Sequence, residues 1–150
     1  MMIECSYTSD GSGKILSNLF PHDFRLDGIE CASMEGFLQS LKFHSDDTAD
    51  HARTLAEMEA YRFGQSGNNW KIDQTLYWNG KSYPRLSAEY HNLLTRAYDA
   101  LMRNPDFCLT LVSTGNDLLI HTRGKHDPRD TTLTQWEYLY QLYRLRSSAQ

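Results

Sequence analysis

Hydrophobic and polar residues follow two different periods along the chain, and each period predicts one kind of element. Apolar residues three and four positions apart, typical of amphipathic helices, predict helices at residues 33–43, 47–63, 87–103 and 105–112, and from residue 134 onward. Short apolar runs bounded by turn-forming residues predict strands at 2–8 and 117–122 and hairpins at 24–31 and 76–83. This order of elements predicts an α+β fold, a mostly helical single domain of residues 1–150 with a small sheet.

Turn and capping residues support the boundaries of several of these elements. Asp27-Gly28 and Asn79-Gly80 are dipeptides that type I′ hairpin turns prefer. Thr134 and Glu137 have the spacing of a capping box at a helix start. Pro105 suits the first turn of a helix and ends the helix before it. These residues set the expected boundaries of both hairpins and of the last three helices.

The remaining segments give simpler expectations. Residues 47–63 predict one helix that Asp46 or Asp47 caps and Gly64 ends. The residues of this helix expected to face the core are Ala52, Leu55, Met58 and Tyr61. Residues 10–13, Asp-Gly-Ser-Gly, predict a turn, and residues 64–85, rich in Gly, Asn and Ser, predict a loop around the second hairpin.

Charge and cysteine content exclude several classes of protein. A length of 150 residues suits one globular domain with its own core. The formal charge of -4 argues against a broad electrostatic grip on nucleic acid, so any such contact would be local. The three cysteines lack CxxC spacing and are expected to be reduced thiols of a cytoplasmic protein. The start of the chain has no positively charged leader with an apolar stretch, so export and membrane insertion are not expected.

One predicted helix carries an unusual polar stripe. Glu35, Gln39 and Lys42 are spaced by four and then three residues, which places them on nearly the same side of a helix. Ser33 is suited to cap this helix, and the dipole at its start favours an ionised Glu35. The other sides carry core residues, namely Met34, Phe37, Leu38 and Leu41. The stripe is either an ordinary polar face that touches water or the floor of a cleft with Glu35 as its chemical group.

Other motifs favour ordinary structural roles. The GSGK sequence at 11–14 lacks the earlier glycine and the following Ser or Thr of a phosphate loop, so it predicts a turn. His121, His126 and Asp127 do not have the spacing of a known helical metal-ligand pair, so neither a metal nor a cofactor is expected. Trp70 lies in a loop rich in Gly and Asn, where it is either a platform that stacks on a base or an anchor packed on the core.

The polar stripe belongs to a longer run of motifs. Residues 14–43, KILSNLFPHDFRLDGIECASMEGFLQSLKF, contain in order Leu-Ser-Asn, a Gly hairpin, Ser-x-Glu and Gln-x-x-Lys-Phe. This run resembles the opening of the NADAR superfamily, the YbiA-like N-glycosidases. The matching residues are Leu16, Ser17, Asn18, Phe20, Pro21, Gly28, Ser33, Glu35, Gln39, Lys42 and Phe43. The resemblance continues through Trp70, residues 102–121 with Asn104, Pro105, Thr114 and Gly115, and the terminal LYRLR.

The resemblance implies water-dependent cleavage of an N-glycosidic bond. It implies as substrate an ADP-ribosyl or other ribosyl-nucleotide compound, such as an ADP-ribosylated guanine in DNA or RNA, or a phosphorylated riboflavin-pathway intermediate. The expected catalytic residues are Glu35, Lys42 and Asp127, with Asp130 as an alternative second carboxylate. The expected substrate-binding residues are Asn18, Gln39, Trp70, Thr114 and Gly115.

The chemistry of this reaction suggests a distinct role for five of these residues. Positive charge grows on the anomeric carbon of the ribose as the bond breaks, so a carboxylate such as Glu35 would stabilise it and direct the attacking water. Lys42 would hold phosphate as a point charge. Gln39 and Asn18 would bond ribose hydroxyls, and Trp70 would stack on the leaving base.

The chain also departs from the family pattern. Gly36 replaces a His, Ala100 replaces a Lys, His121 replaces an acid, and residues 122–136 replace a family loop that contains an aspartate. The lost side chains favour one alternative, a module that binds an ADP-ribose-like nucleotide without cleaving it. A structural or partner-binding protein is the other alternative, and the polar stripe argues against it.

Overall fold

The computed structural model describes all residues from Met1 to Gln150. Its helices are α1 (Gly11–Ile15), α2 (Met34–Ser40), α3 (Asp46–Arg53), α4 (Glu57–Gly64), α5 (Trp70–Asp73), α6 (Ala88–Leu101), α7 (Pro105–Ser113) and α8 (Gln135–Ser148). Its strands are β1 (Met2–Glu4), β2 (Phe24–Leu26), β3 (Ile29–Cys31), β4 (Thr75–Trp78), β5 (Lys81–Pro84) and β6 (Leu118–Ile120). The predicted α+β class is confirmed, and the small sheet is divided into three separate pairs of strands.

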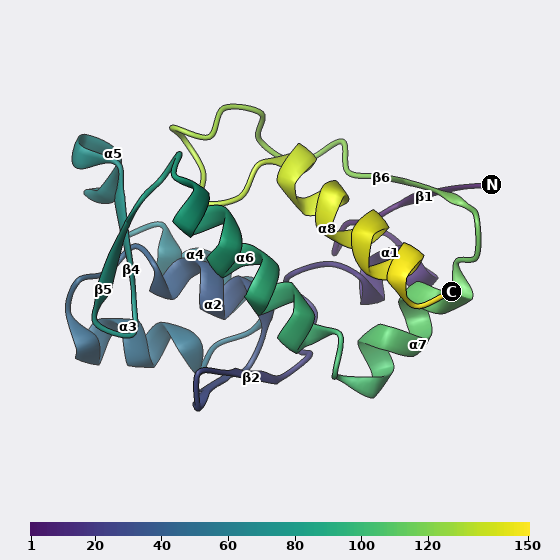
Figure 1. The fold of residues 1–150 in the computed structure, drawn as a ribbon, viewed down its shortest axis with the longest axis horizontal. Helices are drawn as coiled ribbons and strands as arrows, with labels where there is room; N and C mark the ends of the chain where they lie inside the picture. Colours follow the sequence, from purple (N-terminus) through teal and green to yellow (C-terminus); the bar gives the residue numbers. More distant parts are fainter.

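Helix α6 lies at the centre of the fold. It runs beside α8 in Figure 1 and also contacts β2 and β5, while α2 packs on α3 and α4. The core joins Phe37 of α2, Leu94 and Tyr98 of α6, and Leu142 of α8, all nearly inaccessible to solvent. Burial of these apolar faces supplies most of the stability of such helices. No helix, α6 included, is long and apolar enough to cross a membrane.

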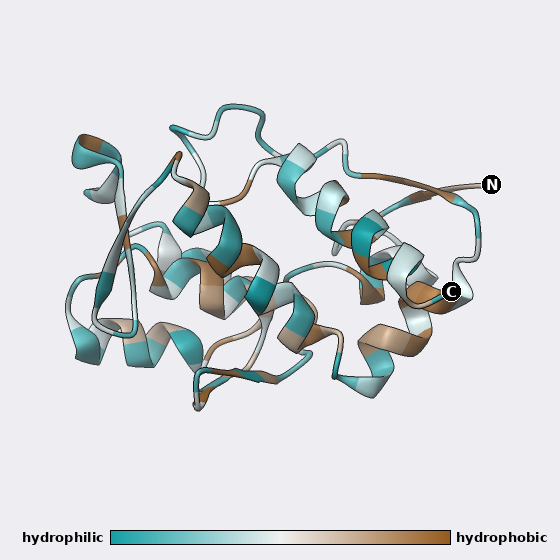
Figure 2. Ribbon diagram, in the orientation of Figure 1, coloured by the Kyte–Doolittle hydropathy of each residue, from teal (hydrophilic) through white to brown (hydrophobic).

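The β1–β6 pair connects the beginning of the chain to its last third. The two strands are parallel, with Met2 opposite Leu118 and Glu4 opposite Ile120. Figure 1 shows the N-terminus and the C-terminus on the same side of the molecule, near this pair. Figure 2 shows that the pair is largely hydrophobic, and Met2 and Leu118 are exposed. Both predicted strands are therefore present, although each is shorter than predicted.

Both predicted hairpins and the predicted caps of α2 and α8 are confirmed. In the two tight turns, Asp27 and Asn79 have φ of 53° and 50°, and the glycine after each has φ of 78°, as type I′ turns require. The Ser33 side chain caps α2, and Thr134 and Glu137 form the capping box of α8. These ends depend on contacts within a few residues, which is why the local sequence predicted them.

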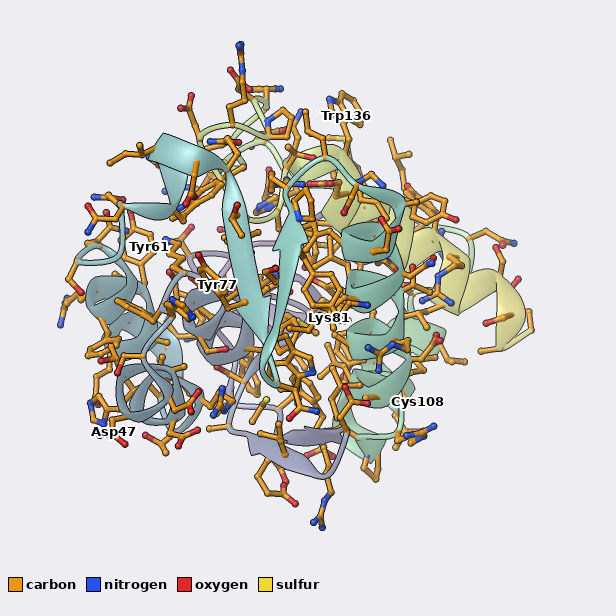
Figure 3. The ribbon with its side chains drawn as sticks, turned by 60° about the vertical axis from the view of Figure 1, so that its left-hand side comes forward. Asp47, Tyr61, Tyr77, Lys81, Cys108 and Trp136 are labelled. Atoms are coloured by element: carbon orange, nitrogen blue, oxygen red, sulfur yellow. The ribbon has the colours of Figure 1, made fainter.

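The single helix predicted at 47–63 is wrong, because the segment forms two helices. The helical pattern breaks between α3 and α4, where Glu57 has a φ of 58° and its N–H donates to the carbonyl of Leu19 at 2.8 Å. Ser45, not an aspartate, precedes α3, and no side chain caps that helix. Ala52 is buried as predicted, but Met58 and Tyr61 are exposed, and Figure 3 shows Tyr61 at the surface. A contact with the distant residue 19 therefore overrides the local helical pattern.

Two further predictions need correction. Residues 11–15, expected to begin as a turn, form the short helix α1, in which Gly13 packs directly against the backbone of Glu4. The loop predicted at 64–85 contains the one-turn helix α5 before its hairpin. In α8, Tyr138 and not Trp136 is the buried aromatic residue, and Figure 3 shows Trp136 projecting from the surface.

Candidate functional site

The polar stripe of α2 faces the interior of the protein. The exposed fractions of Glu35 and Gln39 are 9% and 6%, and every residue from Met34 to Ser40 is buried. The side chain of Ser33 begins the helix by accepting a hydrogen bond from the Gly36 N–H at 2.9 Å. The stripe is therefore not a helix face open to water.

The Glu35 carboxylate has one oxygen bound by the protein. Gln39 Nε2 donates to Glu35 Oε2, and no protein group donates to Glu35 Oε1. Burial raises the pKa of Glu35, while the hydrogen bond from Gln39 and the charge of Lys42 oppose that rise. The site thus contains a partly desolvated carboxylate whose basicity is increased by its surroundings.

Asn18 connects Glu35 to the central helix. The Glu35 backbone N–H donates to Asn18 O at 2.9 Å, and the buried Tyr98 hydroxyl of α6 donates to Asn18 Oδ1 at 2.7 Å. The tyrosine fixes the orientation of the Asn18 amide, whose Nδ2 donates to no protein group. The amide donors of Asn18 are therefore available to a ligand.

Lys42 lies just beyond the end of α2. Its Nζ donates to the Gly64 carbonyl at 3.3 Å, and no carboxylate lies within ion-pair distance of it. Burial lowers the pKa of Lys42 from 10.5 to about 8; Glu35 opposes this change, and Lys125 and Lys71 add to it. At neutral pH the ammonium is still mostly protonated, but its charge is poorly compensated.

The structure explains why residue 36 is a glycine. The Ser33 hydroxyl donates to the Leu55 carbonyl at 2.9 Å, which holds the α3–α4 connection against the first turn of α2. A Cβ atom at Gly36 would lie 2.5 Å from Leu55 O and 2.9 Å from Ala52 O. No side chain fits at residue 36 unless this backbone shifts, so the packing of α3 and the α3–α4 connection requires a glycine there.

The remaining predicted site residues lie in other surroundings. Trp70 is 2% exposed, so its ring is enclosed as an anchor. Asp127 pairs with Arg129 at 3.1 Å within the same loop, and this arginine lowers the pKa of Asp127. The exposed Asp130 belongs to that loop too, and neither aspartate contacts Glu35. Only Glu35, Gln39, Lys42 and Asn18 form one group.

Thr114 and Gly115 lie at the far end of α7. Thr114 Oγ1 donates to Leu111 O at 2.6 Å and accepts from the buried Arg146 at 2.9 Å. Gly115, with a φ of 58°, ends the turn that leads to β6. Figure 1 shows this end of α7 on the opposite side of the molecule from α2, so the structure does not bring these two residues to Glu35.

Two of the departures from the NADAR pattern also have a place in the fold. Ala100 is 3% exposed and belongs to the core. His121 Nδ1 makes a hydrogen bond with Cys5 O at 2.7 Å, and burial lowers the pKa of this histidine. Neither residue contacts the Glu35 group.

Comparisons with known proteins now place the chain in a family. Residues 12–147 match the family described as Bacteriophage protein GP30.3. A 17.1 kDa protein from the Gp30-rIII intergenic region of Enterobacteria phage T4, described as uncharacterized, is 31% identical over 135 residues, which cover 89% of each chain. The chain belongs to the GP30.3 family.

The fold of this GP30.3-family protein has a relative of known structure. It matches the NMR structure of the E. coli protein YbiA with a TM-score of 0.64 and 18% identity, over 99% of this chain and 84% of YbiA. GP30.3 is a NADAR-type family and YbiA is a NADAR family member, so the predicted resemblance to NADAR proteins is confirmed.

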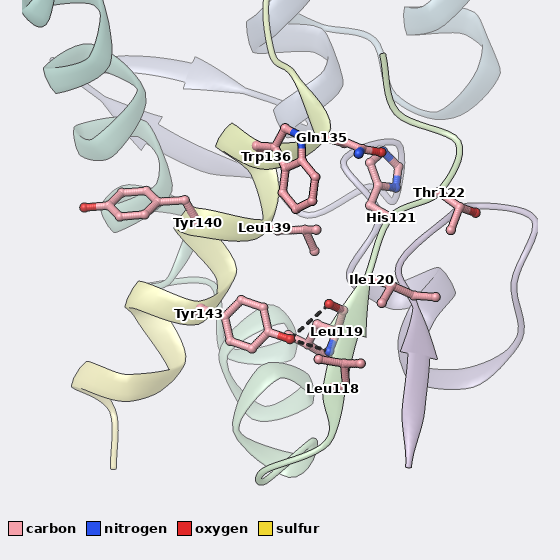
Figure 4. Close-up of a pocket in the computed structure, with 10 residues that line it drawn as sticks. All are labelled: Leu118, Leu119, Ile120, His121, Thr122, Gln135, Trp136, Leu139, Tyr140 and Tyr143. Carbon is pink, nitrogen blue, oxygen red and sulfur yellow. Dashed lines mark hydrogen bonds between the residues drawn. The ribbon is translucent and has the colours of Figure 1, made fainter. Parts of the chain in front are cut away.

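Two surface hollows of the GP30.3-family protein lie outside the Glu35 group. One, of about 520 Å³, runs between β6 and α8, and its lining includes Leu118, Trp136 and Tyr140 (Figure 4). The hydroxyl of Tyr143 bonds both the N–H and the carbonyl of Leu119 there, so it occupies the outer edge of β6. The other hollow, of about 880 Å³, is polar and lies between α3 and the β4–β5 hairpin. No cluster of potential metal ligands is present.

Sequence reasoning missed three residues near the stripe of the GP30.3-family protein. Tyr98 was predicted neither in the site nor as a partner of Asn18, because its position depends on how α6 packs. The charges of Lys71 and Lys125, which belong to separate segments of the chain, contribute to the lowered pKa of Lys42. The only local signals were the position of Lys71 directly after Trp70 and the basic residues around Lys125.

Proposed function

We propose that this protein is an N-glycosidase that hydrolyses the N-glycosidic bond of an ADP-ribose-type compound. The observation that carries the proposal is the buried Glu35 carboxylate, which has one oxygen held by Gln39 and the other without a protein donor. Membership of a NADAR-type family supports the same chemistry.

Glu35 would act on the ribose. As the C–N bond breaks, the leaving base takes the bonding electrons and positive charge develops on the anomeric carbon and ring oxygen. A carboxylate in a site of low dielectric stabilises this charge far better than one in water. Its raised pKa also makes it a stronger base toward the attacking water. The proton of that water passes to Glu35, and the oxygen bonds to the anomeric carbon. Glu35 then gives the proton to the departing base or to solvent, which regenerates the carboxylate, and the free base and the hydroxylated sugar leave.

The neighbouring groups would orient the substrate and keep Glu35 ionised. Gln39 and Lys42 both lower the pKa of Glu35 against the effect of burial. The Asn18 amide, fixed by Tyr98, would donate to a ribose hydroxyl. Glu35 is the one protein carboxylate that this proposal uses. Asp127, the second carboxylate expected from the sequence, is paired with Arg129.

A nucleotide-binding module that does not cleave its ligand is the second candidate. The observation that favours it is the backbone at Gly36, which fills the place of a side chain in the NADAR pattern. Under this alternative the same group of residues would bind ADP-ribose without turnover.

Mass spectrometry of a substrate panel tests the proposal. The panel contains ADP-ribose, NAD, ADP-ribosylated guanosine in DNA and phosphorylated amino-pyrimidine ribosides of the riboflavin pathway. Each is incubated with the wild-type protein, with Glu35→Gln and with Glu30→Gln, a control at an exposed carboxylate. We expect one compound to lose its free base with the wild type and the control, and a rate at least about a hundredfold lower with Glu35→Gln.

Other outcomes would separate the candidates. Full activity of a folded Glu35→Gln variant would remove Glu35 from the mechanism. If no compound is cleaved but one raises the melting temperature, the binding module is the correct function. Cleavage of the pyrimidine ribosides alone would identify a hydrolase of phosphorylated riboflavin-pathway intermediates.

A further inference from the structure

The outward side of α8 carries aromatic residues where a surface helix usually carries charges. The exposed residues of this helix are Trp136, Tyr140, Ser147 and Ser148. Trp136 is 65% exposed and Tyr140 is 61% exposed. The partly exposed Tyr143 follows them at helical spacing. The helix therefore has an aromatic outer face that no other part of the chain covers.

The β1–β6 pair extends this aromatic face. Leu118, Trp136, Tyr140 and Tyr143 all line the hollow of about 520 Å³ between β6 and α8 (Figure 4). Met2 is opposite Leu118 in the parallel register, so both side chains point to the same side of the sheet. They are 62% and 54% exposed. These five residues form one apolar area, the α8–β6 surface.

No free charge lies on the α8–β6 surface. None of its five residues is charged, and the nearest charged groups have partners on the protein. Arg144 of α8 pairs with Asp99 at 2.8 Å, and the Glu4 carboxylate accepts from the Thr122 N–H at 3.0 Å. Nucleic acid and anionic lipid require free cations, and a basic partner requires free carboxylates. The chemistry of the surface therefore fits a partner that is as apolar and uncharged as the surface itself.

The edges of the two strands are closed to an added strand. The Tyr143 hydroxyl accepts from the Leu119 N–H at 2.7 Å and donates to the Leu119 carbonyl at 3.0 Å, which occupies the outer edge of β6. On the outer side of β1, a Cβ atom at Gly13 would overlap the Glu4 carbonyl, so α1 lies against that strand. An extended peptide therefore has no free edge to pair with at Leu119 or Glu4. A partner must pack on the side chains of the surface.

A projecting side chain and a hollow lie next to each other on this surface. Figure 3 shows Trp136 projecting from the molecule, and the hollow beside it has room for an aromatic side chain. A two-fold axis between two copies of the chain would place each Trp136 in the hollow of the other copy. The α8–β6 surface is therefore self-complementary in shape as well as in polarity.

The size of the surface also suits association with a second copy. An aromatic side chain buries about 150 to 250 Å² when fully covered, so Trp136, Tyr140 and the smaller contributions of Met2, Leu118 and Tyr143 offer roughly 500 Å² of apolar area. A standard interface takes about 800 Å² from each partner, of which about 65% is apolar in homodimers. The apolar area available is therefore what one side of a homodimer of standard size requires.

We propose that the chain forms a two-fold symmetric homodimer through the α8–β6 surface, with Trp136 of each copy seated in the hollow between β6 and α8 of the other. Trp136 and Tyr140 are the residue types that most often dominate the binding energy of an interface. The dimer does not depend on the proposed function, because the surface lies outside the Glu35 group.

Sedimentation velocity over a range of protein concentrations tests the proposal. The proteins compared are the wild type, Trp136→Glu, Tyr140→Glu and the control Leu109→Glu, which changes an exposed apolar residue of α7 away from this surface. We expect the wild type and the control to reach twice the mass of the chain as concentration rises. Each of the other two variants, shown to be folded by circular dichroism, should dimerise at least about thirtyfold more weakly.

Three results of this experiment would overturn the proposal. One is a wild type that remains a monomer at every concentration, and another is a dimer that neither Trp136→Glu nor Tyr140→Glu weakens. The third is an equal loss of dimer in the control Leu109→Glu, since that loss would show association without a specific surface.

Tryptophan fluorescence locates the interface independently. Trp70 and Trp78 are each 2% exposed, so acrylamide should quench Trp136 far more than the other two tryptophans of the chain. The quenching constant should fall as the wild-type dimer forms, because Trp136 becomes covered. Trp136→Phe supplies the background from the two buried tryptophans. A dimer in which Trp136 is quenched as strongly as in the monomer would use another surface and would contradict the proposal.

Discussion

Replacing Lys42 by methionine should stabilise the protein. The pKa of Lys42 falls from 10.5 to about 8 on folding, which corresponds to about 3 kcal/mol at about 1.4 kcal/mol per unit. Lys42 is only partly buried, so solvent screening reduces this to roughly 1 to 2 kcal/mol. Methionine keeps the length of the stem and removes the charge, and the hydrogen bond that it loses to Gly64 is long, at 3.3 Å.

The sign of the effect depends on pH. Below pH 8 Lys42 is protonated in both the folded and the unfolded states, so the folded protein bears the full unfavourable contribution. Between pH 8 and about 10.5 the folded state releases the proton that the unfolded state retains, and the contribution disappears. The advantage of Lys42→Met should therefore be about 1 to 2 kcal/mol at pH 7 and close to zero near pH 10.5.

Urea denaturation of both proteins at pH 7 and pH 10 measures this difference. At pH 7 the melting temperature of Lys42→Met should also be higher by roughly 3 to 5 °C. Lys81→Met, at an exposed site, should change stability by less than about 0.5 kcal/mol. A Lys42→Met variant that is less stable than the wild type at pH 7, or equally favoured at both pH values, would refute the reasoning. Stability gained by removing a functional charge is expected of a binding site.

Three other predictions follow from contacts described above or from the same structure. Gly36→Ala should destabilise the protein by about 3 kcal/mol, because the new methyl group would meet the Leu55 carbonyl. Urea denaturation measures this loss of stability. An unchanged denaturation midpoint would mean that the α3–α4 connection can move away from the methyl group. Glu137→Gln should lower the free energy of unfolding by about 3 to 5 kcal/mol at pH 7. The reason is that the carboxylate accepts two hydrogen bonds from the fully buried side chain of Arg85. A loss below about 1 kcal/mol, measured by thermal unfolding, would show that the pair is dispensable. Cys108 should be the first thiol to react with an alkylating reagent in the native protein, because burial raises the pKa of Cys5 and Cys31 to about 12. Mass spectrometry counts the modified thiols, and rapid modification of all three would contradict this prediction.

Local interactions explain which elements the sequence could predict. The caps of α2 and α8 and the Asp-Gly and Asn-Gly turns involve residues within four positions of each other, so their patterns are visible in the chain. The break between α3 and α4 depends on Glu57 and Leu19, which are distant in sequence. Periodicity continues through such a break, so it predicted one helix where the tertiary contact produces two.

The residues of the candidate site also divide into those that the sequence could predict and those that depend on the tertiary fold. The stripe of Glu35, Gln39 and Lys42 could be predicted because the three residues lie close together in the sequence, although Lys42 comes just after the end of α2. The effect of Lys71 and Lys125 on the pKa of Lys42 could not be predicted, because these residues are distant from Lys42 in sequence. Matching Thr114 to a family motif did not reveal its position in the fold, and the structure places it beside Arg146.

The parallel pairing of β1 with β6 has a consequence for the order of folding. β1 ends at Glu4 and its partner begins at Leu118, so β1 is synthesised long before that partner. At about 5 to 20 residues per second, β1 waits roughly 6 to 20 s for that partner. Helices α2 and α6 are synthesised during this interval and can form from local contacts. The apolar strand β1 therefore has no partner while the residues between it and β6 are synthesised, and its closure onto β6 comes late in the formation of this fold.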